Sequence, residues 1–261
     1  MEGMSQLAKS VANSVEVLPL IYKDLAQPSV QKVGKALETV FDLGNTVLLP
    51  IKLANERSKY WFDKHMNDYK AKLDTIPEEK ICEVPPELGV PLIDRLTYTT
   101  NEDIADLFTT LLTKASCVET ANQAHPKFVS IISSLSVDEA KIIKHIKSDI
   151  LYSSLHLYRK ESEGYSEIVS YATGLEYEVN LLFPKNINTY IENLVTLGIL
   201  TNMQGIYKVD KNSYDKLHNM YSNIEESIKE FVGERFERFE WTDSYLKLND
   251  LGTLFIRSCN M

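Results

Sequence analysis

Apolar residues recur at every third or fourth position through most of the first 150 residues, which is the spacing of an amphipathic helix. This pattern predicts helices over residues 5–26, 28–48, 51–73 and 101–117. Pro19 is expected to kink the first helix, and Pro28 is expected to open the second. The N-terminal part of the chain is therefore predicted to be a helical bundle.

The predicted helix over residues 28–48 has a continuous apolar stripe, formed by Val30, Val33, Leu37, Val40, Phe41 and Leu48. This stripe can pack inside a bundle or lie on a membrane surface. Glu38 and Asp42 on the polar face weaken attraction to anionic lipid and favour the bundle. Gly34 and Gly44 indicate that another helix packs closely against this one.

The stretch from His125 to Ile146 is expected to form two short helices joined by a capped turn. Ser136 is a suitable N-cap, and Glu139 follows three residues later, where its carboxylate can reach the backbone N–H of the cap. The sequence before this stretch is helical throughout, whereas β-like runs follow it. The stretch is therefore predicted to be the hinge between two architectures.

Beyond Ile150 the periodicity changes. Residues 151–159 are consistent with a strand or a continued helix, and Gly205 separates two short β-branched runs. The further elements expected are a helix over 186–197, strands near 199–201 and 206–209, a helix over 213–231, a strand over 236–248 and a helix over 249–257. A helix followed by two strands and a short turn is the arrangement of a winged-helix module.

These elements predict a mainly α protein with an N-terminal helical bundle and a winged-helix-like α+β C-terminal part. Four prolines between residues 76 and 94 indicate a rigid linker with a short helix after Pro86. The expected divisions are N-terminal helices over 1–75, a Pro-rich linker over 76–94, a central helical part over 95–150 and the winged-helix-like part over 151–261.

The composition is that of an ordinary globular protein of 261 residues, with a formal net charge of −9 and a pI near 5.2. An acidic chain is a poor default binder of nucleic acid, because phosphate contacts require clustered Lys and Arg. Three widely spaced cysteines, Cys82, Cys117 and Cys259, indicate neither a zinc site nor a disulfide framework. With no signal-peptide pattern and no apolar run long enough to span a bilayer, a cytoplasmic location is expected.

The presumed recognition helix of the winged-helix-like part argues against DNA reading. Residues 187–197 contain neither Lys nor Arg and include the acidic Glu192. Asn186, Asn188 and Asn193 are the obvious candidates there for contacts with base edges. Protein binding or a structural role is favoured for this module.

Candidate chemistry along the chain is sparse. His125 precedes Pro126 in an expected turn, where capping or packing is favoured over general-base catalysis. His65 and His145 lie on apolar helical faces and are expected to be partly buried and hydrogen-bonded. The acidic pair Asp138 and Glu139 is explained by the dipole at a helix start. No catalytic, cofactor-binding or metal-ligating residues are therefore assigned, no cofactor is expected, and the chain is predicted not to be an enzyme.

Three blocks resemble the prokaryotic abortive infection alpha (Abi-alpha) family, a domain of unknown function. They are YKDLAQPSVQKVGKALETV with LLPIKLANERSKYWFDKH, IPEEKICEVPPELGVPLIDRLTYT, and EDIADLFTTLLTKASC with AHPKFVSIISSLSVDEAKIIKHI. The ending LKLNDLGTLFIRSCN is similar to the family's closing T-x-x-G-x-x-F-x-x-x-C pattern, with Asn249 in the place of Thr. The resemblance implies a part in bacterial anti-phage defence and supplies no catalytic residues.

Three functions remain open from the sequence. The first is a non-enzymatic abortive-infection-like protein that acts through protein–protein interaction or oligomerisation. The second is a membrane-active effector that uses its N-terminal amphipathic helices, and the third is a winged-helix DNA-binding regulator. A protein partner or self-association is expected, membrane contact stays open, nucleic acid is disfavoured, and whether the chain binds a small molecule stays open.

Overall fold

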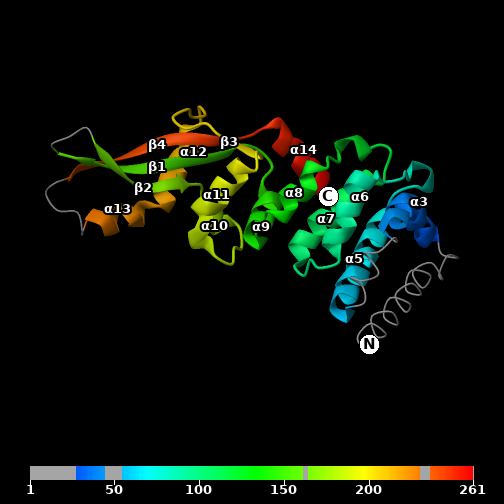
Figure 1. The fold of residues 1–261 in the computed structure, drawn as a ribbon. Coiled ribbons are helices and arrows are strands. Elements are labelled where there is room, and N and C mark those ends of the chain that lie inside the picture. Colours follow the sequence, from blue (N-terminus) through cyan, green and yellow to red (C-terminus); the bar gives the residue numbers. More distant parts are fainter. Residues whose placement is uncertain (1–27, 45–54, 161–163, 230–235, 261) are drawn as a thin grey trace. The chain divides into compact units, whose positions relative to one another are not determined.

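The structure is a computed structural model that describes residues 28–44, 55–160, 164–229 and 236–260 (Figure 1). The helix expected over residues 5–26 and the segment 45–54 lie outside the described residues. The chain forms two compact units, one of residues 1–140 with 254–261 and the other of residues 141–253. Helices predominate, and a four-stranded antiparallel sheet lies in the C-terminal part.

Between residues 28 and 145 the described chain forms a series of α-helices and short 3₁₀ turns. These are α3 (Pro28–Gly44), α5 (Glu56–Asp74), η1 (Glu78–Lys80), α6 (Pro86–Leu96), α7 (Glu102–Ala115), η2 (Ala121–Gln123), α8 (Lys127–Ser133) and α9 (Val137–His145).

Side-chain caps fix where several of these helices begin. The Asn101 side chain accepts a hydrogen bond from the Ile104 N–H at 3.1 Å at the start of α7. At the start of α9, Ser136 N–H donates to Glu139 Oε2 at 2.6 Å, and Glu139 N–H donates to Ser136 Oγ at 3.3 Å. These reciprocal bonds form a capping box, as predicted from the sequence.

The apolar stripes of α3, α5, α6 and α7 meet in the core of the first unit. The buried members of the α3 stripe are Val33, Leu37, Val40 and Phe41. Phe108 of α7 is also almost fully buried. The bundle interpretation of the α3 stripe is therefore confirmed for these residues.

Close helix contact occurs at Gly89 and not at Gly34. A Cβ added at Gly34 would meet nothing within 4 Å, whereas one added at Gly89 would come within 2.3 Å of Val40 Cγ2. The expectation for Gly34 was wrong, because the stripe of α3 packs on α6 through Val40. Gly89 of α6 provides the space for that side chain.

Residues 86–96 form helix α6, which confirms the short helix expected after Pro86. Pro86 stands in the first turn, where its missing N–H costs no hydrogen bond, and Pro91 lies inside the helix. Leu88, Leu92 and Leu96 are buried on one face of α6. The burial of this face outweighs the helix-breaking tendency of Pro91.

The second unit is built on the antiparallel sheet, whose strand order is β2-β1-β4-β3. The strands are β1 (Ile150–Arg159), β2 (Tyr165–Ala172), β3 (Leu200–Asn202) and β4 (Phe236–Leu248). Central strand β1 is buried along most of its length and pairs with β4 from Ile150 to Arg159. Its composition of Leu, Tyr and Ser reflects burial on both faces.

The winged-helix expectation is not confirmed, and neither is an all-α fold. Residues Leu200–Asn202 do form an antiparallel strand, but they pair with Leu246–Leu248 of β4. The expected second strand, residues 206–209, has no strand pairing. Gly205 has a positive φ of 76°, as a glycine-containing turn requires. The expected turn at Gly205 is therefore present, but the two segments that flank it do not pair as a hairpin.

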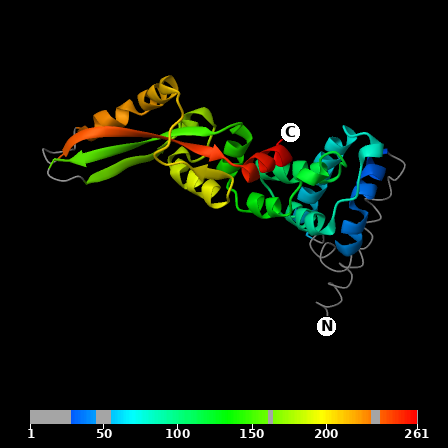
Figure 2. The same cartoon turned by 90° about the horizontal axis from the view of Figure 1, so that it is seen from above.

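Helices pack on both faces of this sheet, with α12 and α13 on one face and α11 on the other (Figure 2). The helical elements of the second unit are α10 (Leu175–Glu178), η3 (Pro184–Asn186), α11 (Ile187–Thr196), α12 (Lys211–Met220) and α13 (Ser222–Lys229). Tyr214, Leu217 and Tyr221 pack against Ala172 of β2. The single helix expected over 213–231 is broken at Tyr221, whose ring points into this cluster.

The chain closes with helix α14 (Asp250–Cys259). Asn249 Oδ1 accepts a hydrogen bond from Gly252 N–H at 2.9 Å, and its Nδ2 donates to Gly198 O at 2.9 Å. Asn249 therefore caps the helix in the place where the family pattern has Thr. Phe255 is fully buried, with its ring edge-on to Phe128 at 5.3 Å, and Cys259 is buried as well.

Candidate functional site

The histidines considered in the sequence have mainly structural surroundings. His125 Nδ1 accepts a hydrogen bond from Lys127 N–H at 3.0 Å, which confirms its capping role. His65 is buried, lies 2.7 Å from Thr99 O through Nε2, and stacks on Trp61. Burial lowers the pKa of His65, so its neutral form is favoured as a satisfied core residue.

His145 differs from the expectation, because its side chain is exposed and lies 3.2 Å from Glu178 Oε2. It stands in the last turn of α9, where the helix ends at the surface. Asp138 and Glu139 are buried at the start of the same helix, and Glu139 is used in the capping box. The three cysteines are free thiols; Cys117 and Cys259 are buried and Cys82 is partly exposed.

A partly buried polar cluster joins β1, β4 and α12, although no sequence motif pointed to it. Ser153 Oγ donates to Asp243 Oδ1 at 2.7 Å and lies 3.0 Å from His218 Nε2. His218 Nε2 also lies 2.8 Å from Asp243 Oδ1, and its ring stacks on Trp241 at 4.8 Å. Strand pairing brings Ser153 opposite Asp243 across 90 residues of sequence.

These three residue types form the catalytic triad of many hydrolases, but the geometry here differs from a triad. In a triad the carboxylate holds Nδ1, so that Nε2 can take the proton of the serine. In this cluster Asp243 and Ser153 both contact Nε2, and Ser153 is fully buried. The cluster therefore satisfies polar groups beneath α12 and does not present an activated nucleophile.

The described part of the chain also lacks two further kinds of site. No group of three His, Cys, Asp or Glu side chains there is placed to hold a metal ion. None of the described helices has the length and apolar content required to cross a bilayer.

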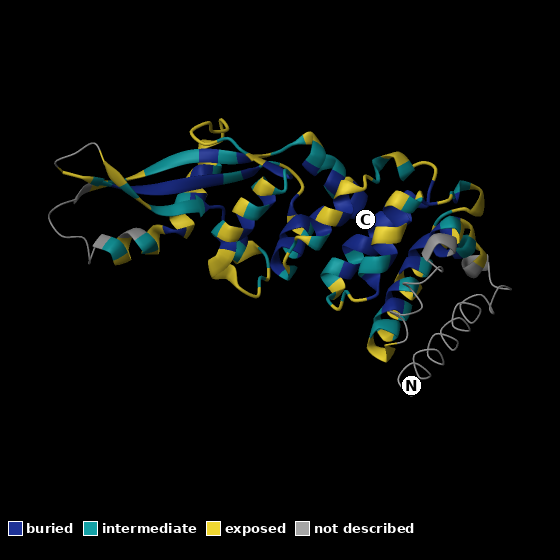
Figure 3. Cartoon of the chain, viewed as in Figure 1, coloured by how far each residue is buried: buried dark blue, intermediate teal, exposed yellow. Residues whose placement is uncertain are grey.

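One loop of the second unit, which follows β2, presents large apolar side chains to solvent. Tyr177, Leu182 and Phe183 are 61%, 60% and 64% exposed, within seven residues of sequence. We refer to these three side chains as the α10 loop surface. Figure 3 shows α10 and the residues after it as mostly exposed. Grouped apolar side chains at a surface are typical of interaction sites, whereas isolated ones are not.

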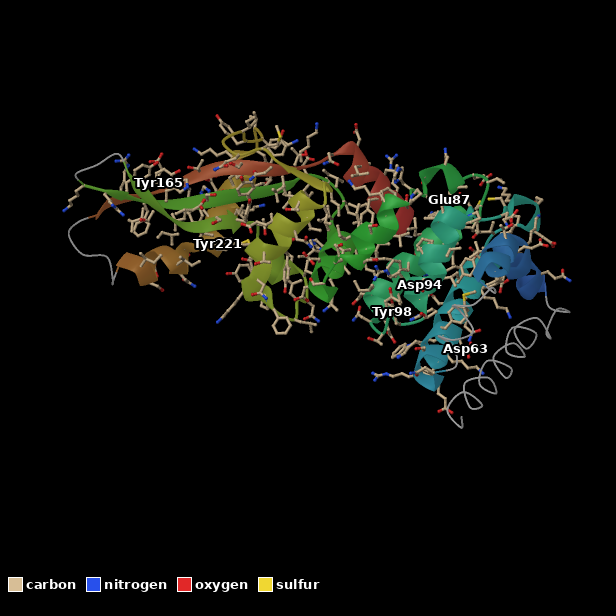
Figure 4. All side chains as sticks on the ribbon, viewed as in Figure 1. Asp63, Glu87, Asp94, Tyr98, Tyr165 and Tyr221 are labelled. Atoms are coloured by element: carbon tan, nitrogen blue, oxygen red, sulfur yellow. The ribbon has the colours of Figure 1, made fainter. Side chains whose placement is uncertain are left out.

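Hydrogen bonds from the protein interior hold the start of this loop in place. Gly174, with φ of 78°, turns the chain from β2 into α10 and donates its N–H to Tyr221 Oη at 2.9 Å. Tyr221 Oη donates to Glu176 Oε1 at 2.5 Å, and its ring lies edge-on to Tyr177 at 5.7 Å. Tyr221 comes from the junction of α12 and α13 (Figure 4). A single buried tyrosine therefore positions the start of α10.

Helix α9 supports the next part of the loop. Lys141 Nζ donates to Asn180 O at 2.8 Å, and His145 faces Glu178. Within the loop itself, Val179 N–H donates to Leu175 O at 2.8 Å. The loop backbone is thus held at several points while the side chains of the α10 loop surface remain exposed.

Glu176 is the titratable group of this support. Burial raises its pKa above the ordinary value, and the hydrogen bond from Tyr221 partly offsets that effect. Its second oxygen, Oε2, is buried and receives no hydrogen bond from the described residues. Burial also raises the pKa of Tyr221, so its hydroxyl stays protonated and keeps donating to Glu176.

Comparisons with known proteins place the chain in a family. No curated protein matches it. A solved structure described as an uncharacterized protein from the hydrocarbon-degrading marine bacterium Alcanivorax borkumensis SK2 is 15% identical, with a TM-score of 0.29; the match covers 54% of this chain and 95% of that one. The family model described as Abortive infection alpha matches residues 56–259, which include all of the second compact unit and the part of the first from residue 56 on. The chain therefore belongs to the Abortive infection alpha family.

Proposed function

We propose that this protein takes part in abortive-infection defence against phage by binding a protein partner, without catalysing a reaction itself. The observation that carries the proposal is the α10 loop surface. Its three side chains provide large apolar contact areas on a backbone that is already ordered. Such a surface loses little conformational entropy when it binds.

The alternative functions gain less support from the described residues. The α3 stripe that a membrane-surface helix would need is buried within the first unit. Helix α11 buries Ile187, Tyr190, Ile191 and Leu194, and its sequence contains no Lys or Arg for a DNA backbone. Binding to another protein in the cytoplasm is the simplest function that uses the surface.

The test is phage protection by cells that carry a double variant, Leu182→Ser with Phe183→Ser. Loss of two interface anchors costs at least about 2 kcal/mol of binding, or ~30-fold in affinity. Plaque formation should therefore rise toward that of cells without the gene, while the melting temperature of the purified variant stays unchanged.

A matched control is the double variant Ile206→Ser with Tyr207→Ser. These side chains are 52% and 64% exposed in the loop between β3 and α12. The control should protect as well as the natural protein. Full protection by the Leu182/Phe183 variant would contradict the proposed function.

A further inference from the structure

The charge around the α10 loop surface is opposite to that of the chain as a whole. The two segments that meet there, residues 141–147 and 173–186, contain four lysines and two glutamates. The whole chain has 28 basic and 37 acidic residues. The surface is therefore an apolar patch with a locally basic border on an acidic protein.

Contacts place Lys141, Glu176 and Glu178 at the loop. Lys141 reaches the loop at Asn180 O, which lies between Tyr177 and Leu182. Lys185 is exposed two residues after Phe183. Of the two glutamates, Glu178 faces His145 at 3.2 Å and Glu176 accepts from Tyr221 inside the unit. Lys141 and Lys185 therefore lie beside the α10 loop surface, together with Glu178.

We propose that the α10 loop surface binds an acidic, amphipathic segment of a partner protein. The apolar side chains of that segment pack on Leu182 and Phe183, and its carboxylates face Lys141 and Lys185. This inference rests on the proposed function and specifies its partner. Apolar anchors provide affinity, whereas complementary charges provide selectivity and fast association. An acidic segment is attracted to this border even though the protein carries a net charge of −9.

An anionic membrane would share the basic and apolar chemistry but fits the surface less well. Glu178 lies on the border, and the net charge of the chain opposes approach to an extended anionic surface. A peptide segment can place its carboxylates opposite the lysines and avoid Glu178. A discrete protein segment is therefore the occupant that the charges favour.

The experiment is photocrosslinking of the full chain in phage-infected cells, with p-benzoylphenylalanine at position 183 and, as a control, at the equally exposed position 207. Crosslinked peptides are sequenced by mass spectrometry. The expected result is a crosslink from position 183 to an acidic segment of another protein that contains apolar residues, and no such crosslink from position 207. A crosslink to lipid, to this protein itself or to a segment without acidic excess would overturn the inference, as would no crosslink at all.

A charge reversal separates this inference from the proposed function. Lys185→Glu should lower the crosslink yield by about threefold or more, since it places a like charge opposite the partner's carboxylates. Lys211→Glu, which changes an exposed lysine of α12, should leave the yield unchanged. If Lys185→Glu has no effect on yield or protection while Leu182→Ser with Phe183→Ser abolishes protection, the acidic partner is wrong and the protein-binding function stands. If neither variant loses protection, both fail.

Discussion

Gly252 shows how a single residue decides the geometry of the second unit. A Cβ at this position would come within 2.1 Å of Ile199 O, a backbone atom that cannot move aside by a rotamer change. The glycine of the family's closing pattern is thus required by a close approach of two backbones.

We therefore expect Gly252→Ala to destabilise the protein by about 2 kcal/mol or more, the upper range of overpacking. The change is measured as the shift in the urea midpoint at constant slope. Thr253→Ala, at a partly exposed neighbouring position, serves as the control and should change stability by less than about 1 kcal/mol. Equal stability of Gly252→Ala and the natural protein would show that the two backbones are further apart.

Glu176 predicts a pH dependence with a defined sign. Its pKa is raised in the folded protein, so the folded state holds this proton at pH values where the unfolded state has lost it. Its contribution is fully present below the ordinary pKa of 4.5 and is lost as the pH rises through the folded pKa.

Glu176→Gln keeps an oxygen that accepts from Tyr221 and has no proton to lose. The variant should match the natural protein at pH 4 and be more stable at pH 8, as measured by urea unfolding at both values. A variant that is less stable at pH 8 would show that the carboxylate is favoured in this site.

The helices and strands of this chain differ in how far sequence could predict them. Helix α7, the capping box at Ser136 and strand β4 depend on local spacing and local hydrogen bonds, and their limits are close to those expected. Strand β3 could not be paired correctly, because its partner in β4 lies more than 40 residues away. The apolar residues Ile206 and Val209 suggested a strand, but they are exposed in a loop instead.

The candidate site was missed for the same physical reason. Leu182 and Phe183 look like core residues in the sequence, and only the fold leaves them exposed. Tyr221 read as one position of a long helix, whereas its contacts with Gly174 and Glu176 are made across more than 40 residues. DNA binding by residues 187–197 could, by contrast, be disfavoured from the sequence alone, because this segment contains no Lys or Arg.

Helix α3 provides the prediction at the scale of an element. Val40 is almost fully buried, and its side chain packs in the space that the missing Cβ of Gly89 leaves. Val40→Asp would therefore bury an unpaired carboxylate. We expect a loss of about 3 kcal/mol or more, together with loss of soluble protein. Gln31→Asp, on the exposed side of the same helix, should change stability by no more than about 0.5 kcal/mol. An unchanged melting temperature with abolished liposome flotation would favour a membrane-docking helix.

At the scale of the whole molecule, the match to the Abortive infection alpha family spans residues 56–259 and includes parts of both compact units. The Ser153–His218–Asp243 cluster lacks the division of roles that a triad needs, whereas the α10 loop surface is exposed and well supported. The central claim is that this surface becomes covered by a partner when the protein acts.

Hydroxyl-radical footprinting measures that coverage directly, by comparing side-chain oxidation of the protein in uninfected and phage-infected cells. Phe183 and Tyr177 should be oxidised readily before infection and several-fold less after it, while Tyr207, which is as exposed as Phe183, should react equally in both. Equal oxidation of Phe183 before and after infection, in cells that are protected from phage, would contradict the account.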